Sequence, residues 1–184
     1  MVVRMAAASG VDLIDEMFRS EGMREYLGEP VTLIEHMLQA ATIAEAEGAP
    51  DELVAAALLH DIGHVRTTTQ SGSEDRHAEG GATWLSACFP SSVTEPVRLH
   101  VAAKRYLCAV EPEYAAGLSD ASTRSLAAQG GAMSRAEVND FERSPYFSNA
   151  VSVRRWDEAA KNPDVQTYPF EHFRPLLERL QIST

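Results

Sequence analysis

The chain has 184 residues, the size of one ordinary domain, and is long enough to bury a core without disulfides or a structural metal. Hydrophobic residues make up 45% of the chain and charged residues 23%, so extended disorder is excluded. With 16 basic against 27 acidic residues, the net charge is −11, which opposes nonspecific binding to nucleic acid or an anionic membrane. An anionic substrate must therefore be held by a few local cations.

Cysteine usage and hydropathy favour a cytoplasmic protein without a membrane anchor. Cys88 and Cys108 have no CxxC spacing and cannot form a disulfide framework, so we expect both thiols to be reduced. The apolar run at residues 1–8 is too short for a secretory signal, and no later segment approaches the roughly 18 apolar residues of a membrane span. We therefore expect a soluble, unprocessed chain.

Apolar residues recur at helical spacing, without a convincing alternating strand, internal repeat or low-complexity tract. The pattern predicts an all-α fold in one domain over residues 1–184, divided into an N-terminal helix and loop (1–32), a helical core (33–161) and a C-terminal helix (162–184). The expected helices lie, in chain order, at 11–19, 33–47, 51–63, 75–87, 93–109, 121–129, 135–142, 149–161 and 170–180.

Local signals set some of these boundaries. Thr32 and Glu35 have the capping-box spacing that opens the second helix. Gly63 predicts the end of the third helix, and Pro175 predicts a kink or a break in the last one. The segment 66–73 is polar and rich in turn-forming residues, so it predicts a loop.

The third predicted helix carries the most informative residues. It is apolar on every side over 53–59 and then presents His60 and Asp61 to the interior. A buried carboxylate without a partner is costly, so we expect a cation beside it. The partial negative charge of a helix C-terminus adds attraction for a metal ion. A metal site accounts for these features better than a salt bridge does.

Two residues far apart in sequence complete this pattern. His36 shares a helical face with apolar neighbours, and alone it would be read as a hydrogen-bonded core histidine. Combined with His60 and Asp61, it is better interpreted as a ligand. The order of these three residues, followed far downstream by an isolated helical Asp157, resembles the metal-binding fingerprint of the HD-domain superfamily.

Two more histidines extend the candidate site. His77 and His100 lie on further predicted helices, each with small or apolar neighbours on its face. Adding them gives enough ligands for two metals if Asp61 bridges the pair. Imidazole and carboxylate ligands suit iron, manganese or zinc and argue against an all-oxygen calcium or magnesium site. The residues alone leave the choice among the first three open.

Longer motifs make the resemblance closer. They are, in chain order, Tyr26-Leu27-Gly28-Glu29, Glu35-His36, the segments 58–64, 99–107, 118–122 and 129–131, and Arg154-Arg155-Trp156-Asp157. Together these motifs are similar to those of the HD-domain mixed-valent diiron oxygenases of organophosphonate degradation, which are relatives of myo-inositol oxygenase. The similarity runs from about Tyr26 to the C-terminus.

The resemblance implies a helical bundle of the HD type that binds two iron ions as a mixed-valent Fe(II)/Fe(III) pair and uses O2 as co-substrate. The ligands implied for one iron are His36, His60, Asp61 and Asp157, and those for the other are Asp61, His77 and His100. The residues implied around the phosphonate are Tyr26, Glu29, His64, Lys104, Ser122, Ser125, Gln129 and Arg154. The catalytic set implied is Tyr26, Asp61, His64 and Lys104.

Helical spacing supports the two cations independently. Lys104 lies four residues after His100, and Arg154 lies three residues before Asp157, so each cation shares a face with a predicted ligand. A cation beside a metal is repelled unless an anion lies between them. A phosphonate is such an anion.

The implied reaction is O2-dependent cleavage of the carbon–phosphorus bond of a 1-hydroxyphosphonate, giving phosphate and a carboxylic acid. In this family the tyrosine at the position of Tyr26 can occupy an iron position before substrate arrives, and the glutamate at that of Glu29 meets the substrate amine. A neutral substituent at carbon 2 would leave that carboxylate unpaired, so we expect a cationic one. Because a primary ammonium can donate hydrogen bonds, (R)-2-amino-1-hydroxyethylphosphonate, cleaved to glycine, is favoured over its trimethylammonio analogue, which would give glycine betaine. A 2-oxoglutarate-dependent hydroxylase is expected as the functional partner that supplies the substrate.

Two other functions fit parts of the sequence. An HD phosphohydrolase acting on a phosphate ester or nucleotide could use the same metals, with Lys104 and Arg154 stabilising charge on phosphorus. A noncatalytic HD module could bind a regulatory ligand or protein, although six intact metal-binding side chains argue against a binding relic.

Overall fold

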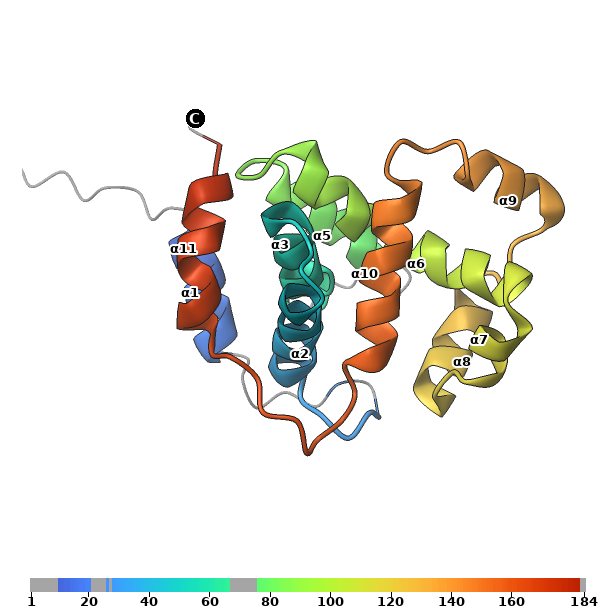
Figure 1. Ribbon diagram of the computed structural model, residues 1–184, viewed down its shortest axis with the longest axis horizontal. Coiled ribbons are helices and arrows are strands. Elements are labelled where there is room, and N and C mark those ends of the chain that lie inside the picture. The colour runs from blue at the N-terminus through green and yellow to red at the C-terminus, as the bar shows by residue number, and fades with distance from the viewer. Residues whose placement is uncertain (1–9, 21–25, 27, 67–75, 183–184) are drawn as a thin grey trace, which may run out of the picture.

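A computed structural model describes residues 10–20, 26, 28–66 and 76–182. All the regular elements in these ranges are helices, which confirms the all-α prediction (Figure 1). They are α1 Gly10–Ser20, α2 Leu33–Ala46, α3 Asp51–Leu59, α4 Ile62–Arg66, α5 His77–Leu85, α6 Ser91–Val110, α7 Pro112–Ala116, α8 Asp120–Ala128, α9 Arg135–Phe141, α10 Phe147–Ala159 and α11 Phe170–Leu180.

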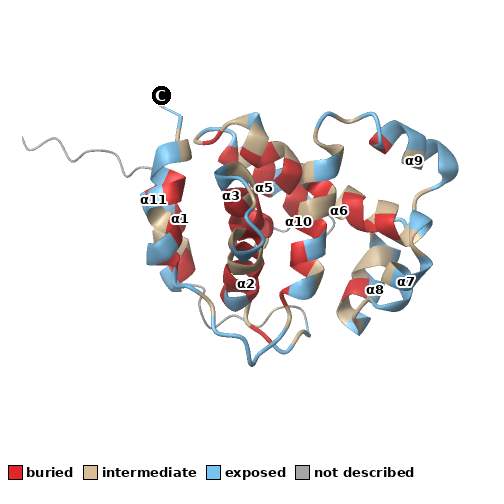
Figure 2. Ribbon diagram, viewed as in Figure 1, coloured by how far each residue is buried: buried red, intermediate tan, exposed pale blue. Residues whose placement is uncertain are grey.

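The apolar helix α3 lies inside the bundle. It packs against α2, α6, α10 and α11, and its residues from Val54 to Leu59 are all buried. Helices α1 and α11 pair at one end of the molecule, while α7, α8 and α9 lie at the other end (Figure 1). Buried positions are dense on α2 and α3 and sparse on α7, α8 and α9 (Figure 2). The bundle therefore has a firmly packed centre and a more polar end.

The start of α2 follows the capping box predicted from sequence. The Thr32 hydroxyl accepts a hydrogen bond from the Glu35 backbone N–H at 3.2 Å, and the Glu35 carboxylate accepts one from the Thr32 N–H at 2.7 Å. This pair fixes the first turn of α2 and so the rotational position of His36, which comes one residue later. His36 is fully buried on the inward face.

The region around Gly63 corrects one prediction. Helix α3 ends at Leu59, the chain turns at His60 and Asp61, and the next residues form α4, so Gly63 lies inside a helix and does not end one. A Cβ at Gly63 would come within 2.0 Å of the His77 carbonyl oxygen. The glycine therefore permits close approach of α4 to the start of α5, and this approach brings His77 to Asp61.

Other features complete the comparison with the sequence predictions. The short helix α7 was not predicted. Helix α11 continues through Pro175, so of the two outcomes predicted there, a kink or a break, the break does not occur. Most of the loop expected at 66–73 lies outside the described residues. Cys88 and Cys108 are both free. None of the described helices is long and apolar enough to cross a membrane.

Candidate active site

A first cluster of candidate metal ligands joins α2, the end of α3 and α10. The Nε2 atoms of His36 and His60 are 3.0 Å apart, and His36 Nε2 is 3.3 Å from Asp157 Oδ1. The Nδ1 atoms of His36 and His60 lie 2.8 Å from the carbonyl oxygens of Ala160 and Ala57 respectively. A carbonyl only accepts, so each ring donates through Nδ1 and turns its Nε2 atom toward the other ring. A metal cation between the two rings would bind both Nε2 atoms.

A second cluster repeats this arrangement with residues from α5 and α6. The Nε2 atoms of His77 and His100 are 3.1 Å apart, and both rings are buried. His100 donates from Nδ1 to the Val97 carbonyl at 2.7 Å, so its Nε2 lone pair also faces inward. The two Nε2 atoms lie 3.3 and 3.5 Å from Asp61 Oδ1. A second cation fits this set of atoms.

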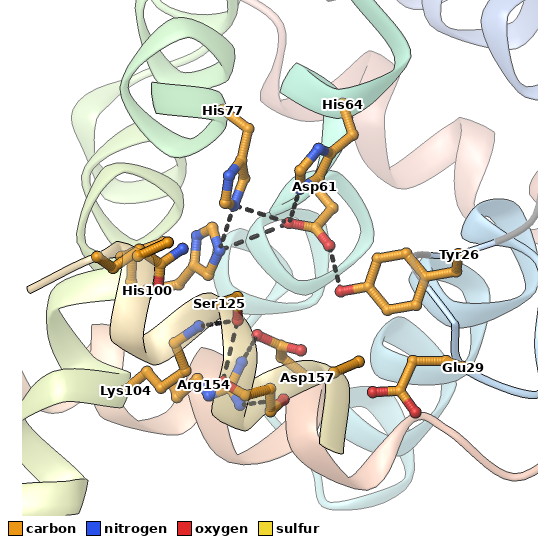
Figure 3. A pocket seen from close by; sticks show the side chains of 15 residues that line it. Tyr26, Glu29, Asp61, His64, His77, His100, Lys104, Ser125, Arg154 and Asp157 are labelled. Atoms are coloured by element: carbon orange, nitrogen blue, oxygen red, sulfur yellow. Dashed lines mark hydrogen bonds and ion pairs between the residues drawn. The ribbon is translucent and has the colours of Figure 1, made fainter. Parts of the chain in front are cut away.

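Asp61 lies between the two clusters and turns one oxygen toward each. Its Oδ1 faces His77 and His100 (Figure 3). Its Oδ2 is 3.4 Å from His60 Nε2. In each cluster, Asp61 and its two histidines offer ligand atoms that lie within 4.8 Å of one another. Asp157 Oδ1 is buried and receives no hydrogen bond from the described residues. This mixed oxygen and nitrogen donor set, with a carboxylate shared between two positions, fits two metal ions of the iron, manganese or zinc type.

The charges of the clusters keep the carboxylates ionised, as metal ligands must be. Burial alone would raise the pKa values of Asp61 and Asp157, but His60 beside Asp61 and Arg154 beside Asp157 hold both well below the usual range. Against the effect of burial, Asp61 and Asp157 raise the pKa of His60 to about 9, so a metal ion bound at His60 Nε2 would have to displace a proton from that nitrogen. Burial lowers the pKa of His100 to about 3, so this imidazole is neutral.

A pocket with a cavity volume of about 70 Å³ opens onto the clusters. It contains all the site residues predicted from sequence except His36 and His60, which are fully buried behind Asp61. Figure 3 shows Tyr26 and Glu29 on one side of the pocket and Lys104 with Ser125 on another. The wall with Ser125 comes from α8, which also brings the predicted Ser122 and Gln129 to the pocket.

Lys104 is the cation of the pocket with the fewest partners. It is only 4% exposed, and its Nζ donates to Ser125 Oγ at 2.8 Å. Within the described residues it forms no ion pair. Burial, and then the charge of Arg154, lower the pKa of Lys104 to about 8. An anion entering the pocket would therefore be attracted by the buried ammonium of Lys104, which no carboxylate in the described residues pairs with.

Arg154 is engaged differently. Its Nε donates to the Tyr114 hydroxyl at 2.6 Å, one terminal nitrogen donates to Asp157 Oδ2, and the other donates to Glu158. These contacts use most of the five N–H donors of the guanidinium. Arg154 thus orients Asp157 as well as lining the pocket, a role that the sequence did not indicate.

Tyr26 and His64 flank Asp61. The Tyr26 hydroxyl donates to Asp61 Oδ2 at 2.7 Å, and its ring stacks on His36 with centroids 4.2 Å apart. Burial, and then the charge of Asp61, raise the pKa of Tyr26 well above its usual value, so it is a neutral phenol. His64 stacks on His77 at 3.9 Å, and its Nε2 lies 3.9 Å from Asp61 Oδ1.

Glu29 has partners that the sequence analysis missed. Its Oε1 accepts a hydrogen bond from the Ser119 hydroxyl at 2.5 Å and lies 3.2 Å from Lys161 Nζ. Glu29 is therefore already paired, and the expectation that a neutral substituent would leave it unpaired is wrong. Lys161 lies four residues after Asp157, so the helical spacing that pointed to Lys104 could have indicated it. No sequence pattern around Ser119 could have indicated its contact with Glu29.

Comparison with known proteins agrees with this geometry. A model of the HD domain matches residues 33–116, which include five of the six predicted metal ligands. The glycine-betaine-forming 1-hydroxy-2-(trimethylamino)ethylphosphonate dioxygenase of Leisingera caerulea is 50% identical over 175 residues, covering 92% of this chain and 89% of that protein. The chain belongs to the family of HD-domain phosphonate dioxygenases.

Two further relatives widen the family. Hydroxymethylphosphonate dioxygenase of Gimesia maris is 45% identical over 167 residues, covering 85% of this chain and 83% of that protein. An uncharacterized protein of Acanthamoeba polyphaga mimivirus is 34% identical over 182 residues, covering 95% of this chain and 83% of that protein. The family is one of oxidoreductases, which confirms the resemblance drawn from the motifs and does not favour the phosphohydrolase alternative.

Proposed function

We propose that this protein is an iron-dependent oxygenase that cleaves the carbon–phosphorus bond of a 1-hydroxyphosphonate. The atoms balance with one O2 per substrate, because the carbon fragment leaves as a carboxylic acid and phosphorus leaves as phosphate. The observation that supports this function best is Asp61, which turns one oxygen to each histidine pair beside a pocket that contains the buried Lys104.

The ligands that would hold one iron are His36, His60, Asp61 and Asp157, and those for the other are Asp61, His77 and His100. A mixed-valent Fe(II)/Fe(III) pair would supply the redox chemistry that O2 activation and oxidation of carbon 1 require. The protein supplies the fixed geometry, because carbonyl oxygens hold the Nδ1 atoms of His36, His60 and His100.

The remaining residues bind and orient the substrate. We propose that Lys104 binds the phosphonate oxygens, with Ser125 and Ser122 as hydroxyl partners on α8. Tyr26 covers Asp61 through its hydrogen bond and must give way when the substrate hydroxyl reaches the clusters. His64 and Gln129 close the sides of the pocket, which keeps bulk water away from the reacting carbon.

We propose a trimethylammonio substituent at carbon 2, ahead of the primary ammonium that the sequence favoured. The Leisingera caerulea relative acts on the trimethylated compound. In addition, Ser119 and Lys161 already occupy Glu29 Oε1, which leaves less acceptor capacity for the N–H groups of a primary ammonium. A trimethylammonium needs no acceptor, and the ring of Tyr26 offers it an aromatic face. A 2-oxoglutarate-dependent hydroxylase is the class of enzyme that would install the hydroxyl at carbon 1.

The test is phosphate release from the trimethylammonio, amino and unsubstituted 1-hydroxyphosphonates by protein loaded with iron under low oxygen. We expect release only after O2 is admitted, with one O2 consumed per phosphate and glycine betaine formed from the trimethylated compound. Phosphate release without O2, or full activity with zinc alone, would reject the oxygenase in favour of a hydrolase.

A further inference from the structure

The chain contains only two lysines, and both are near the pocket. Lys104 faces the cavity, whereas Lys161 follows α10 and lies behind the pocket wall. The side chain of Lys161 is 11% exposed and that of its partner Glu29 is 8% exposed. In a chain with a net charge of −11, an ammonium so little exposed at this position is a specific feature that the reaction described above does not use.

Lys161 joins the loop that carries Glu29 to the end of α10. Its Nζ lies 3.2 Å from Glu29 and 2.9 Å from Glu158, and it donates to Ser122 Oγ at 2.7 Å. Arg154 also pairs with Glu158. Since Glu158 has this second cation, Lys161 is the counter-charge that remains for Glu29. The pair is little exposed to solvent, so salt screens it weakly.

This ion pair changes how strongly the pocket attracts a cationic substituent at carbon 2. A neutral substituent leaves the Glu29–Lys161 ion pair intact, so neither charge loses its partner. A cationic substituent has to share Glu29 with Lys161, and like charges brought to one carboxylate repel each other. The attraction that Glu29 offers a cation is therefore reduced by a charge that the protein itself supplies.

We propose that Lys161 is a specificity-determining residue: by neutralising Glu29 it sets how strongly the pocket prefers a cationic over a neutral substituent at carbon 2. The proposal rests on the phosphonate substrate class proposed above. It assigns Lys161 no contact with the reacting atoms, so its signature is a change in preference between ligands of equal shape and different charge.

The experiment uses two ligands that have the same shape and differ only in the charge of the substituent. The 2-(trimethylammonio)ethylphosphonate and 3,3-dimethylbutylphosphonate ions have the same shape, and both lack the hydroxyl group needed for turnover. Their dissociation constants are measured by calorimetry on the metal-loaded protein without O2. The pair 2-aminoethylphosphonate and propylphosphonate repeats the comparison with smaller ligands.

We expect Lys161→Met to shift the ratio of dissociation constants toward the cationic ligand by about tenfold, because Glu29 then lacks its counter-charge. Lys161→Arg keeps the charge and should retain the wild-type ratio. Arg155→Met removes a cation from the outer face of α10, where Arg155 is 48% exposed and paired with Glu111, so it serves as the matched control. In a Glu29→Gln background, Lys161→Met should no longer change the ratio.

Equal weakening of both ligands by Lys161→Met, or an unchanged ratio, would overturn the inference and leave the oxygenase function standing. If the wild-type protein binds none of these phosphonates, both proposals fail. A shifted ratio in a protein that releases no phosphate with O2 would support Lys161 as a specificity residue and reject the reaction.

Discussion

The side chains at the two ends of the site, the histidine clusters at the inner end and Glu29 at the outer end, are positioned by different kinds of contact. At the inner end, the buried rings of His36, His60 and His100 are fixed by backbone carbonyls from packed helices. At the outer end, Glu29 is held by the side chains of Ser119 and Lys161. Backbone positions change only if the helices move, whereas a side-chain partner changes with one substitution. The comparison indicates that the proposed metal positions depend on the core, whereas the proposed substrate contact at Glu29 depends on side chains that can change at little cost to the fold.

The largest effect is expected at the inner end. Because Asp61 faces both histidine pairs, Asp61→Ala should lose both irons and lower kcat by about a thousandfold or more. The measurements are iron content per chain by mass spectrometry and O2-dependent phosphate release. A variant that keeps its full iron content would refute the bridging role.

His100→Ala is the control for that prediction. It removes a ligand from one cluster only, so we expect iron content to fall toward one ion per chain while circular dichroism remains helical. Loss of both irons here as well would mean that the two positions fill cooperatively and that Asp61 has no special place.

A smaller effect is expected at the wall between the two ends. Lys104→Met removes the proposed charge-assisted contact to the phosphonate, worth about 1.5 to 3 kcal/mol, so KM should rise about 10- to 100-fold with iron content unchanged. Arg105→Met is the matched control, because Arg105 follows Lys104 on α6 but points outward to Glu137. Unchanged KM in the Lys104 variant would show that the phosphonate binds elsewhere.

The pH dependence of KM sharpens the same point. Burial lowers the pKa of Lys104 to about 8, and only the protonated ammonium attracts a phosphonate. KM should therefore be flat below about pH 8 and rise above it, by about tenfold per pH unit. In Lys104→Arg the guanidinium stays protonated, so this rise should disappear from the profile. A rise that persists in Lys104→Arg would belong to another group.

Sequence predicted the inner end far better than the outer end, for a physical reason. Helical periodicity places His36, His60 and His100 on buried faces. One such histidine would be read as a core residue, but several of them together with a buried aspartate indicate a metal site. The capping box of α2 could be read from two residues because the interaction is local. The role of Gly63 was predicted wrongly. A glycine is needed there because the His77 carbonyl, 14 residues away in sequence, lies too close for a side chain, and no local pattern reveals that contact.

The outer end depends on contacts between segments far apart in the chain. Ser119 lies 90 residues from Glu29, so its hydrogen bond to Glu29 has no sequence signature. Glu158 and Lys161 do follow helical spacing from Arg154 and Asp157, but on a helix charged residues at such spacing most often form a solvated face. Only the folded chain distinguishes a buried network from such a face.

The smallest effect is expected at Tyr114, on the helix α7 that sequence did not predict. Tyr114 accepts from Arg154 Nε at 2.6 Å, and Arg154 in turn donates to Asp157. Tyr114→Phe removes this acceptor without changing any charge or any direct ligand. Outer partners of metal ligands typically change metal affinity about 10- to 100-fold, and since Tyr114 is one step further out we expect the lower end, about tenfold. Iron affinity measured by competition with a chelator should weaken while KM at saturating iron stays the same. If KM rises and iron affinity does not change, Arg154 acts on the phosphonate rather than on Asp157, and the inner end of the pocket is less rigid than its backbone contacts suggest.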